Sequence, residues 1–156
     1  IELLDLNAED EVIDLFCGLG NFTLPISRYV KKIVGIEGER GLVERAKANA
    51  LMNAITNASF YKADLFDDVS GSEWFRGQKY NKALIDPART GAIEIVELLP
   101  KLGVEHLVYV SCNPATLARD TARLIELDFT LISAGVMDMF PQTAHVESIA
   151  VFKSKK

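Results

Sequence analysis

The chain has 156 residues, of which 49% are hydrophobic and 25% are charged, and its formal net charge is −5. This length and composition are typical of one globular domain with a sizeable core, and no apolar run approaches the roughly 20 residues of a membrane span. The negative charge excludes a surface that is basic all over, so any contacts with nucleic acid phosphates would be local.

The cysteines and the first residue bear on the cellular compartment, on metal binding and on the extent of the chain. Two cysteines give no disulfide framework, so we expect a reducing cytoplasm. The cysteines and histidines lack zinc-type spacing, so we expect no metal site. Because the chain begins with Ile1, we expect residues 1–156 to be one domain of a longer protein.

Apolar, strand-like runs alternate with amphipathic helical patterns along the chain. One helix carries an apolar stripe that includes Ala50 and Leu51, and another is expected to end near Pro100. The alternation predicts a doubly wound α/β fold, with a mostly parallel seven-stranded sheet and helices on both faces. The expected strands cover residues 12–16, 33–36, 59–61, 83–85, 106–110, 129–136 and 148–152, and the expected helices cover residues 23–30, 40–52, 93–99 and 114–127.

The residues just after the first three expected strands suit a nucleoside, because ligands of such sheets bind beyond the carboxyl ends of the strands. Gly18 and Gly20 let the backbone turn tightly, but Thr23 stands where a dinucleotide fingerprint requires a third glycine or alanine. Glu37 suits ribose hydroxyls and Asp64 suits an adenine amino group, so S-adenosylmethionine is a candidate ligand. The alternative is that both acids are ordinary exposed residues and the glycines only make a turn.

Cys112 lies between an expected buried strand and an expected helix. Pro114 suits the first helical position, so Cys112 precedes a helix N-terminus, where backbone N–H groups and the helix dipole favour an anion. Cys112 is therefore a candidate nucleophile. The alternative is that Cys112 is a small buried hydrophobe, which is the commonest role of a free cysteine and the one we expect for Cys17.

Four segments carry a family resemblance: Asp-Leu-Phe-Cys-Gly-Leu-Gly-Asn-Phe at residues 14–22, Asp-Pro-Ala-Arg at 86–89, Ser-Cys-Asn-Pro-Ala-Thr-Leu-Ala-Arg-Asp at 111–120, and Asp-Met-Phe-Pro through His-Val-Glu at 138–147. With these segments the chain resembles the catalytic domain of the RNA uracil-carbon-5 methyltransferases. It is most similar to the RlmD type, which modifies 23S ribosomal RNA. The resemblance runs over nearly the whole chain, and the last two segments, in this order, are highly specific.

The resemblance implies a Rossmann-like, S-adenosylmethionine-dependent methyltransferase fold, with one catalytic domain over residues 1–156. Cys112 matches the family nucleophile, Glu147 the base, and Asp86 a residue at the junction of cofactor and target base. Members of this type also carry an N-terminal RNA-binding domain and an iron–sulfur cluster, which we expect in the missing part of the chain. The positions that match cofactor contacts are Phe16, Asn21, Glu37, Asp64 and Asp86.

The implied reaction transfers a methyl group to carbon 5 of a uridine in RNA. Carbon 5 is a poor nucleophile, and adding a thiolate to carbon 6 makes an enolate that can attack the methyl group. A base must then remove the proton from carbon 5 before the thiolate leaves. The target base must be flipped or unpaired, and Asn113 or backbone N–H groups would stabilise the uracil oxygen.

Two other classes stay open. An adenine-amino methyltransferase would share the fold, but the segment from Asp86 to Arg89 lacks the aromatic residue that stacks on a flipped adenine. A cofactor- or RNA-binding module without activity is the non-enzymatic alternative. Arg89 and Arg119 are either RNA phosphate contacts or exposed salt-bridge partners, and His145 is expected to shape the loop that holds Glu147. The expected protein is a cytoplasmic monomer that acts on RNA.

Overall fold

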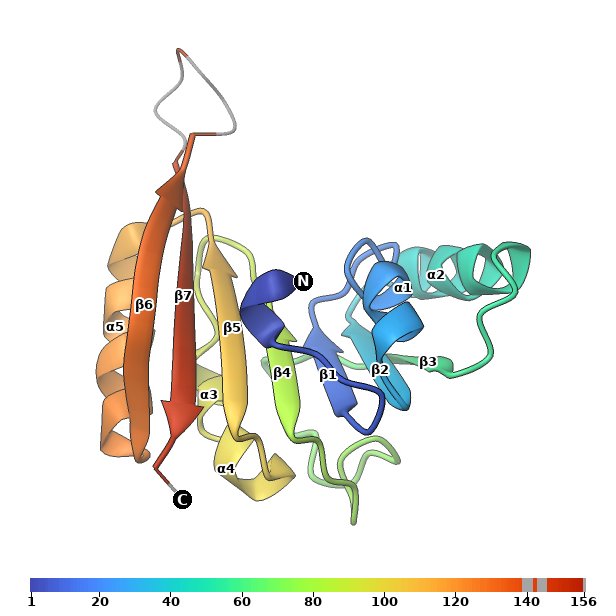
Figure 1. Cartoon of the computed structure of the whole chain (residues 1–156), viewed down its shortest axis with the longest axis horizontal. Coiled ribbons are helices and arrows are strands. Elements are labelled where there is room, and N and C mark those ends of the chain that lie inside the picture. Colours follow the sequence, from blue (N-terminus) through green and yellow to red (C-terminus); the bar gives the residue numbers. More distant parts are fainter. Residues whose placement is uncertain (139–141, 143–145, 156) are drawn as a thin grey trace.

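The computed structural model describes residues 1–138, 142 and 146–155, and within them one seven-stranded sheet forms the centre of the molecule. Its strand order is β3-β2-β1-β4-β5-β7-β6 (Figure 1). The strands from β1 to β5 pair in parallel, whereas β7 is antiparallel to both of its neighbours. The predicted mostly parallel α/β sheet is therefore confirmed. The strands are β1 (Glu11–Leu15), β2 (Lys32–Glu37), β3 (Ala58–Lys62), β4 (Lys82–Ile85), β5 (His106–Ser111), β6 (Phe129–Met137) and β7 (Glu147–Ser154).

Helices cover both faces of the sheet, as predicted. On one face, strand residues such as Ile13 and Tyr109 form a core cluster with α3, α4 and α5. On the other face, Val12 and Leu84 pack against η1 and α1, which lie in front of the sheet in Figure 1. No helix in the described part of the chain is long and apolar enough to cross a membrane. The helices are η1 (Glu2–Leu4), α1 (Thr23–Ile26), η2 (Ser27–Tyr29), α2 (Arg40–Met52), α3 (Ile93–Val96), α4 (Leu99–Leu102) and α5 (Pro114–Glu126).

Three details of the predicted helices are wrong. The single helix over residues 23–30 is the four-residue α1 followed by the 3-10 helix η2, which ends at Tyr29. The single helix over residues 93–99 is two short helices, and Pro100 lies in the first turn of α4 instead of ending a helix. Proline is tolerated there because the first N–H groups of a helix need no partner within the helix. Leu51 is 81% exposed, since α2 ends one residue later and its buried face consists of Val43, Ala46 and Ala50.

The parallel strands place the chemically interesting residues at one edge of the sheet. The carboxyl ends of β1, β2, β4 and β5 point the same way, toward the top of Figure 1, and antiparallel β7 begins there. We call this edge the carboxyl edge. It receives the turn after β1, Glu37 at the end of β2, Asp86 after β4, Cys112 after β5 and Glu147 at the start of β7.

Candidate active site

The predicted nucleophile, Cys112, and the predicted base, Glu147, adjoin paired residues of β5 and β7 at the carboxyl edge. In the antiparallel pairing of β5 with β7, Ser111 lies opposite Ser148. Continuing this register by one residue brings Cys112 opposite Glu147. Directly opposed residues of an antiparallel pair have Cβ atoms about 5 Å apart. Both side chains are partly exposed, so a ligand at the carboxyl edge has access to the thiol and to the carboxylate.

A tight turn holds Cys112 ahead of α5. The Ser111 hydroxyl accepts a hydrogen bond from the Asn113 N–H at 3.1 Å and donates one to the Asn113 carbonyl at 3.0 Å. The side chain of Asn113 accepts from the Ala115 N–H at 3.1 Å and so caps the helix. Pro114 opens the helix, as predicted. Cys112 thus precedes the end of α5 where the helix dipole stabilises negative charge.

Asp86 joins this pair from the neighbouring strand. It follows β4, which lies between β1 and β5, and its N–H donates to the Leu15 carbonyl at 3.3 Å. Burial raises the pKa of Asp86, and the negative charge of Glu147 raises it further. The carboxylates of Asp86 and Glu147 therefore lie close enough to repel each other.

Asp14 is a buried carboxylate near the carboxyl end of β1. It is fully buried in β1, and its Oδ2 accepts a hydrogen bond from the Thr23 hydroxyl at 2.5 Å. Its Oδ1 has no hydrogen-bond partner among the described residues. Burial raises the pKa of Asp14 to about 7; the Thr23 hydrogen bond opposes this, and the charges of Asp86 and Glu37 add to it. Asp14 had no predicted role of its own, although a carboxylate in an apolar strand was the available signal.

The turn after β1 is tightly wound, as its glycines predict. Phe16, Gly18 and Gly20 have positive φ angles of 65°, 56° and 85°. Cys17 lies in this turn and packs in the core against Phe60, and burial raises the pKa of its thiol. The prediction that Cys17 is a packing residue is therefore confirmed.

Glu37 ties the end of β2 to this turn. Its Oε2 accepts from the Gly18 N–H at 3.0 Å, and its Oε1 accepts from the Glu39 N–H at 2.9 Å. A carboxylate has about four lone-pair sites, so each oxygen keeps room for one hydroxyl donor. Asp64 is exposed after β3, and its Oδ1 accepts from the Phe66 N–H at 3.0 Å.

An aromatic pair lies between the turns after β1 and β3. The rings of Phe16 and Phe66 are tilted by 50°, with centroids 5.8 Å apart, and Phe66 is 47% exposed. Such rings offer an apolar surface on which a planar base can pack. Phe16 was a predicted site residue, but Phe66 was not, because its only signal in the sequence was its position two residues after Asp64.

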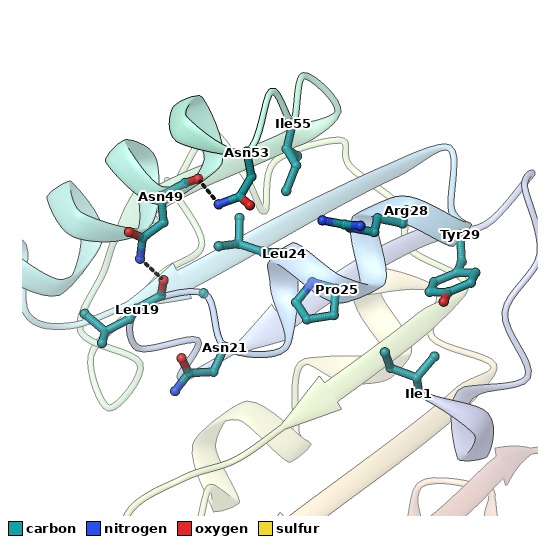
Figure 2. Close-up of a pocket in the computed structure, with 11 residues that line it drawn as sticks. Ile1, Leu19, Asn21, Leu24, Pro25, Arg28, Tyr29, Asn49, Asn53 and Ile55 are labelled. Atoms are coloured by element: carbon teal, nitrogen blue, oxygen red, sulfur yellow. Dashed lines mark hydrogen bonds between the residues drawn. The ribbon is translucent and has the colours of Figure 1, made fainter.

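A cavity of about 440 Å³ lies against the outer side of the glycine turn, between α1 and the C-terminal half of α2 (Figure 2). Asn49 donates to the Leu19 carbonyl at 3.2 Å, and Asn53 donates to the Asn49 carbonyl at 2.8 Å. Of the predicted site residues, only Asn21 borders this cavity.

Part of the fourth motif falls outside the described residues, including Phe140, Pro141 and His145. The predicted role of His145 stays a prediction. Within residues 1–138, 142 and 146–155, no three His, Cys, Asp or Glu side chains gather in a way that could hold a metal ion.

The family model described as tRNA (Uracil-5-)-methyltransferase matches residues 1–156. The chain belongs to this family. A 23S rRNA (uracil(1939)-C(5))-methyltransferase RlmD of Vesicomyosocius okutanii is 73% identical over 152 residues, which are 97% of this chain and 35% of the relative. The RlmD of Francisella tularensis subsp. novicida is 57% identical over 154 residues, 98% of this chain and 34% of the relative. The chain thus spans about a third of the length of these uracil-5-methyltransferases.

Solved structures agree with this family. The Pyrococcus abyssi tRNA (uracil-54, C5)-methyltransferase, in complex with S-adenosyl-L-homocysteine, matches with a TM-score of 0.79 and 27% identity over 97% of this chain and 36% of that chain. The N-methyltransferase NodS of Bradyrhizobium japonicum, with S-adenosyl-L-homocysteine, matches with a TM-score of 0.78 and 16% identity over 99% of this chain and 85% of that chain. At that identity the second match concerns the fold alone, and this fold is the Rossmann-like one of S-adenosylmethionine-dependent methyltransferases.

Proposed function

We propose that this chain transfers a methyl group from S-adenosylmethionine to carbon 5 of a uridine in RNA. The observation that carries the proposal is the register of β5 and β7, in which Ser111 lies opposite Ser148, the residues adjacent to Cys112 and Glu147. The reaction needs one group that attaches to the base and a second that removes a proton from the adjacent carbon, so both must reach the same ring. Membership of the uracil-5-methyltransferase family supports this assignment.

The residues at the carboxyl edge fit S-adenosylmethionine. Each oxygen of Glu37 keeps room for a ribose hydroxyl, and one oxygen of Asp64 stays open to an adenine amino group. Phe16 offers its ring to the adenine, while Asn21 is exposed on the glycine turn beside the amino-acid part. Asp86 brings negative charge near the positive sulfonium. When bound, this cofactor supplies an electrophilic methyl group.

Cys112 begins the reaction as the nucleophile. Its thiolate sulfur forms a bond to carbon 6 of uracil, and the electrons of the carbon 5–carbon 6 double bond move toward the uracil oxygen. Carbon 5 would thereby be activated to form its bond to the methyl carbon, whose bond to the sulfonium sulfur would break with S-adenosylhomocysteine as the leaving group. The positive end of the α5 dipole, which directly follows Cys112 and Asn113, would stabilise the developing negative charge.

Glu147 completes the reaction as the base. Its carboxylate takes the proton from carbon 5, the carbon 5–carbon 6 double bond forms again, and the bond from carbon 6 to the Cys112 sulfur breaks. Asp86 lies close enough to affect Glu147 electrostatically, and burial raises the pKa of Asp86.

The substrate that we propose is 23S ribosomal RNA, because the two relatives described above are named for it. We further propose that residues 1–156 form the catalytic domain, that RNA-binding and iron–sulfur parts lie in the remaining length of such proteins, and that the enzyme acts as a monomer in the cytoplasm, where ribosomal RNA is found. Arg89 is the proposed RNA phosphate contact. Its side chain is exposed and has no ion-pair partner among the described residues.

Trapping with 5-fluorouridine RNA tests the function. Fluorine cannot leave carbon 5 as a proton does, so the wild-type protein with S-adenosylmethionine should form a covalent RNA adduct that survives denaturation. Cys112→Ala should form none, while it keeps its affinity for S-adenosylhomocysteine. An adenine-amino methyltransferase would ignore this substrate, so absence of a wild-type adduct together with methylation of adenine would overturn the proposal.

A further inference from the structure

We propose that Asp120 of α5 is a positioning residue, which fixes the loop of residues 86–92 against the elements that carry Cys112. We call residues 86–92 the β4 loop. It begins with Asp86 and runs beside the start of α5. The inference rests on the proposed function, because it concerns how Asp86 and Cys112 are held for the same reaction.

Asp120 connects three elements through one buried carboxylate. It is 0% exposed, and its Oδ2 accepts hydrogen bonds from the Ala92 N–H at 2.8 Å and from the Tyr109 hydroxyl at 2.6 Å. Its Oδ1 pairs with the Arg119 guanidinium, with Nε at 2.8 Å and Nη2 at 2.7 Å. The same guanidinium donates to the Thr90 carbonyl at 3.0 Å. The β4 loop, β5 and α5 therefore meet at this carboxylate.

A second set of bonds holds the middle of the β4 loop. The Arg89 carbonyl accepts from Asn113 Nδ2 at 2.9 Å and from the Thr116 hydroxyl at 3.3 Å. Asn113 directly follows Cys112, and its side-chain oxygen caps α5 at the same time. One side chain thus joins the nucleophile's turn, the helix and the β4 loop.

Gly91 shows how closely the loop fits against α5. Its φ angle is +80°, which favours glycine. A Cβ atom at this position would lie 2.6 Å from Arg119 Nη2, 2.7 Å from Asp120 Oδ2 and 3.1 Å from the Cβ of Thr116. A larger residue must displace the β4 loop or the α5 side chains that hold it, because all three of these atoms belong to α5.

These bonds have a consequence for catalysis. Asp86 and Cys112 follow neighbouring parallel strands, so the sheet sets their starting points but not the path of the chain beyond them. The network around Asp120 fixes that path on both sides. A displacement of about 1 Å in a reacting group can cost on the order of a hundredfold in rate. Loosening the network should therefore slow the chemical step without weakening cofactor binding at β1 to β3.

Removing the Asp120 carboxylate leaves the Tyr109 hydroxyl and the Arg119 guanidinium without their partner, so Asp120→Ala is a poor test because it risks unfolding. Gly91→Ala displaces the loop without removing a polar group. Gly71→Ala is its matched control, since a Cβ at Gly71 meets nothing within 4 Å. Thr116→Val removes the hydroxyl, which can donate to the Arg89 carbonyl at 3.3 Å or to the Asn113 carbonyl at 3.0 Å, and Thr116→Ser is the conservative variant that keeps it.

The experiment measures single-turnover methylation by the full-length protein at saturating RNA and S-adenosylmethionine, the affinity for S-adenosylhomocysteine, and the thermal midpoint. Gly91→Ala should slow methylation by at least about tenfold, and Thr116→Val by a smaller factor, with cofactor affinity unchanged within about twofold. Gly71→Ala and Thr116→Ser should match the wild type.

An unchanged methylation rate in Gly91→Ala would overturn the positioning role. So would a rate that falls only in proportion to lost cofactor affinity or lost folded protein, because the network would then be merely structural. A wild-type protein that methylates no uridine at all would instead refute the proposed function, and the control variants distinguish the two failures.

Discussion

Loss of Glu147 should block a later step of the proposed reaction than loss of Cys112 does. Glu147→Gln keeps the size of the side chain but cannot take the proton from carbon 5, so methyl transfer proceeds while release of the RNA does not. We expect a methylated RNA–protein adduct to accumulate with ordinary uridine RNA, visible as a labelled methyl group on the protein in a denaturing gel. Glu73→Gln, at an exposed residue before β4, is the control. Normal turnover without an adduct would assign the base to another residue.

Asp14 should make stability depend on pH in an unusual direction. Its pKa in the folded chain is about 7, above the ordinary value of 3.8, so the folded protein keeps a proton that the unfolded chain has lost. The stability contributed by Asp14 is therefore fully present below about pH 4 and is lost as pH rises toward 7.

Asp14→Asn tests this effect because asparagine keeps an acceptor for the Thr23 hydroxyl. Urea unfolding of both proteins between pH 4 and 8 gives their free energies of unfolding. The variant should gain on the wild type as pH rises to about 7 and then stay level. A difference that does not change with pH would show that Asp14 is ionised in the folded protein.

The sequence predicted which residues belong to the site better than it predicted which residues lie next to one another in space. The resemblance named Cys112 and Glu147, which are 35 positions apart in the chain. Their adjacency depends on β7 pairing antiparallel to β5, and no local pattern specifies that pairing. Asp120 lay inside a recognised motif, yet its links to Ala92 and Tyr109 follow only from the packing of α5 against β5 and the β4 loop.

At the scale of elements, the packing of β2 requires glycine at position 35, because neighbouring side chains leave no room for a Cβ atom. A Cβ at Gly35 would lie 2.8 Å from Phe60 Cδ1 and 2.9 Å from Cys17 Sγ. Gly35→Ala should therefore lower the free energy of unfolding by about 1–3 kcal/mol, the usual cost of overpacking a core. Gly38→Ala, where the nearest atom is an ordinary 3.7 Å away, should change it little. Chemical denaturation of both variants checks the expectation, and equal stability of the two would contradict it.

The two arginines beside the β4 loop should differ in their effect on RNA. Arg119 is bound to Asp120 and to the Thr90 carbonyl, whereas the Arg89 side chain is exposed and has no ion-pair partner in the described part of the chain. Arg89→Ala should weaken RNA binding and lower the slope of log affinity against log salt by about 1. Arg76→Ala makes the same charge change in the turn that leads to the amino end of β4 and should leave the slope unchanged. Equal slopes for all three proteins would remove Arg89 from the RNA interface.

The elements that the sequence predicted well are those whose apolar residues repeat with one clear period. The strands and the long helices α2 and α5 match their predicted ranges within about two residues, because their apolar patterns alone specify them. The break between α3 and α4 was missed, since Pro100 is compatible both with ending a helix and with opening one. Leu51 was misplaced because an apolar residue at a helix end satisfies the periodic pattern without being buried.

Across the whole molecule, the strand order separates the proposed cofactor contacts from the proposed nucleophile and base. The order β3-β2-β1-β4-β5-β7-β6 reverses direction between β1 and β4, and ligands of doubly wound sheets bind at such a switch point. The proposed cofactor contacts follow β1, β2 and β3, while Cys112 and Glu147 belong to β5 and β7. Asp86 follows β4, at the boundary between these two groups. The negative charge of Asp86 raises the pKa of Asp14 on one side, and the negative charge of Glu147 raises the pKa of Asp86 on the other.

This division predicts which ligands stabilise the fold. A ligand that binds only the folded chain adds about 2.7 kcal/mol at a hundred times its dissociation constant. For a domain of this size, that corresponds to a rise in the thermal midpoint of about 5–10 °C. S-adenosylhomocysteine should produce this rise, because it places a nucleoside without phosphates beside Glu37 and Asp64. ATP should not, because its triphosphate would meet the negative charges of Asp86 and Glu37 and finds no third glycine in the turn. Thermal unfolding with each ligand decides the matter: a larger shift with ATP would mean that the glycine turn binds phosphates and that the nucleoside assignment is wrong.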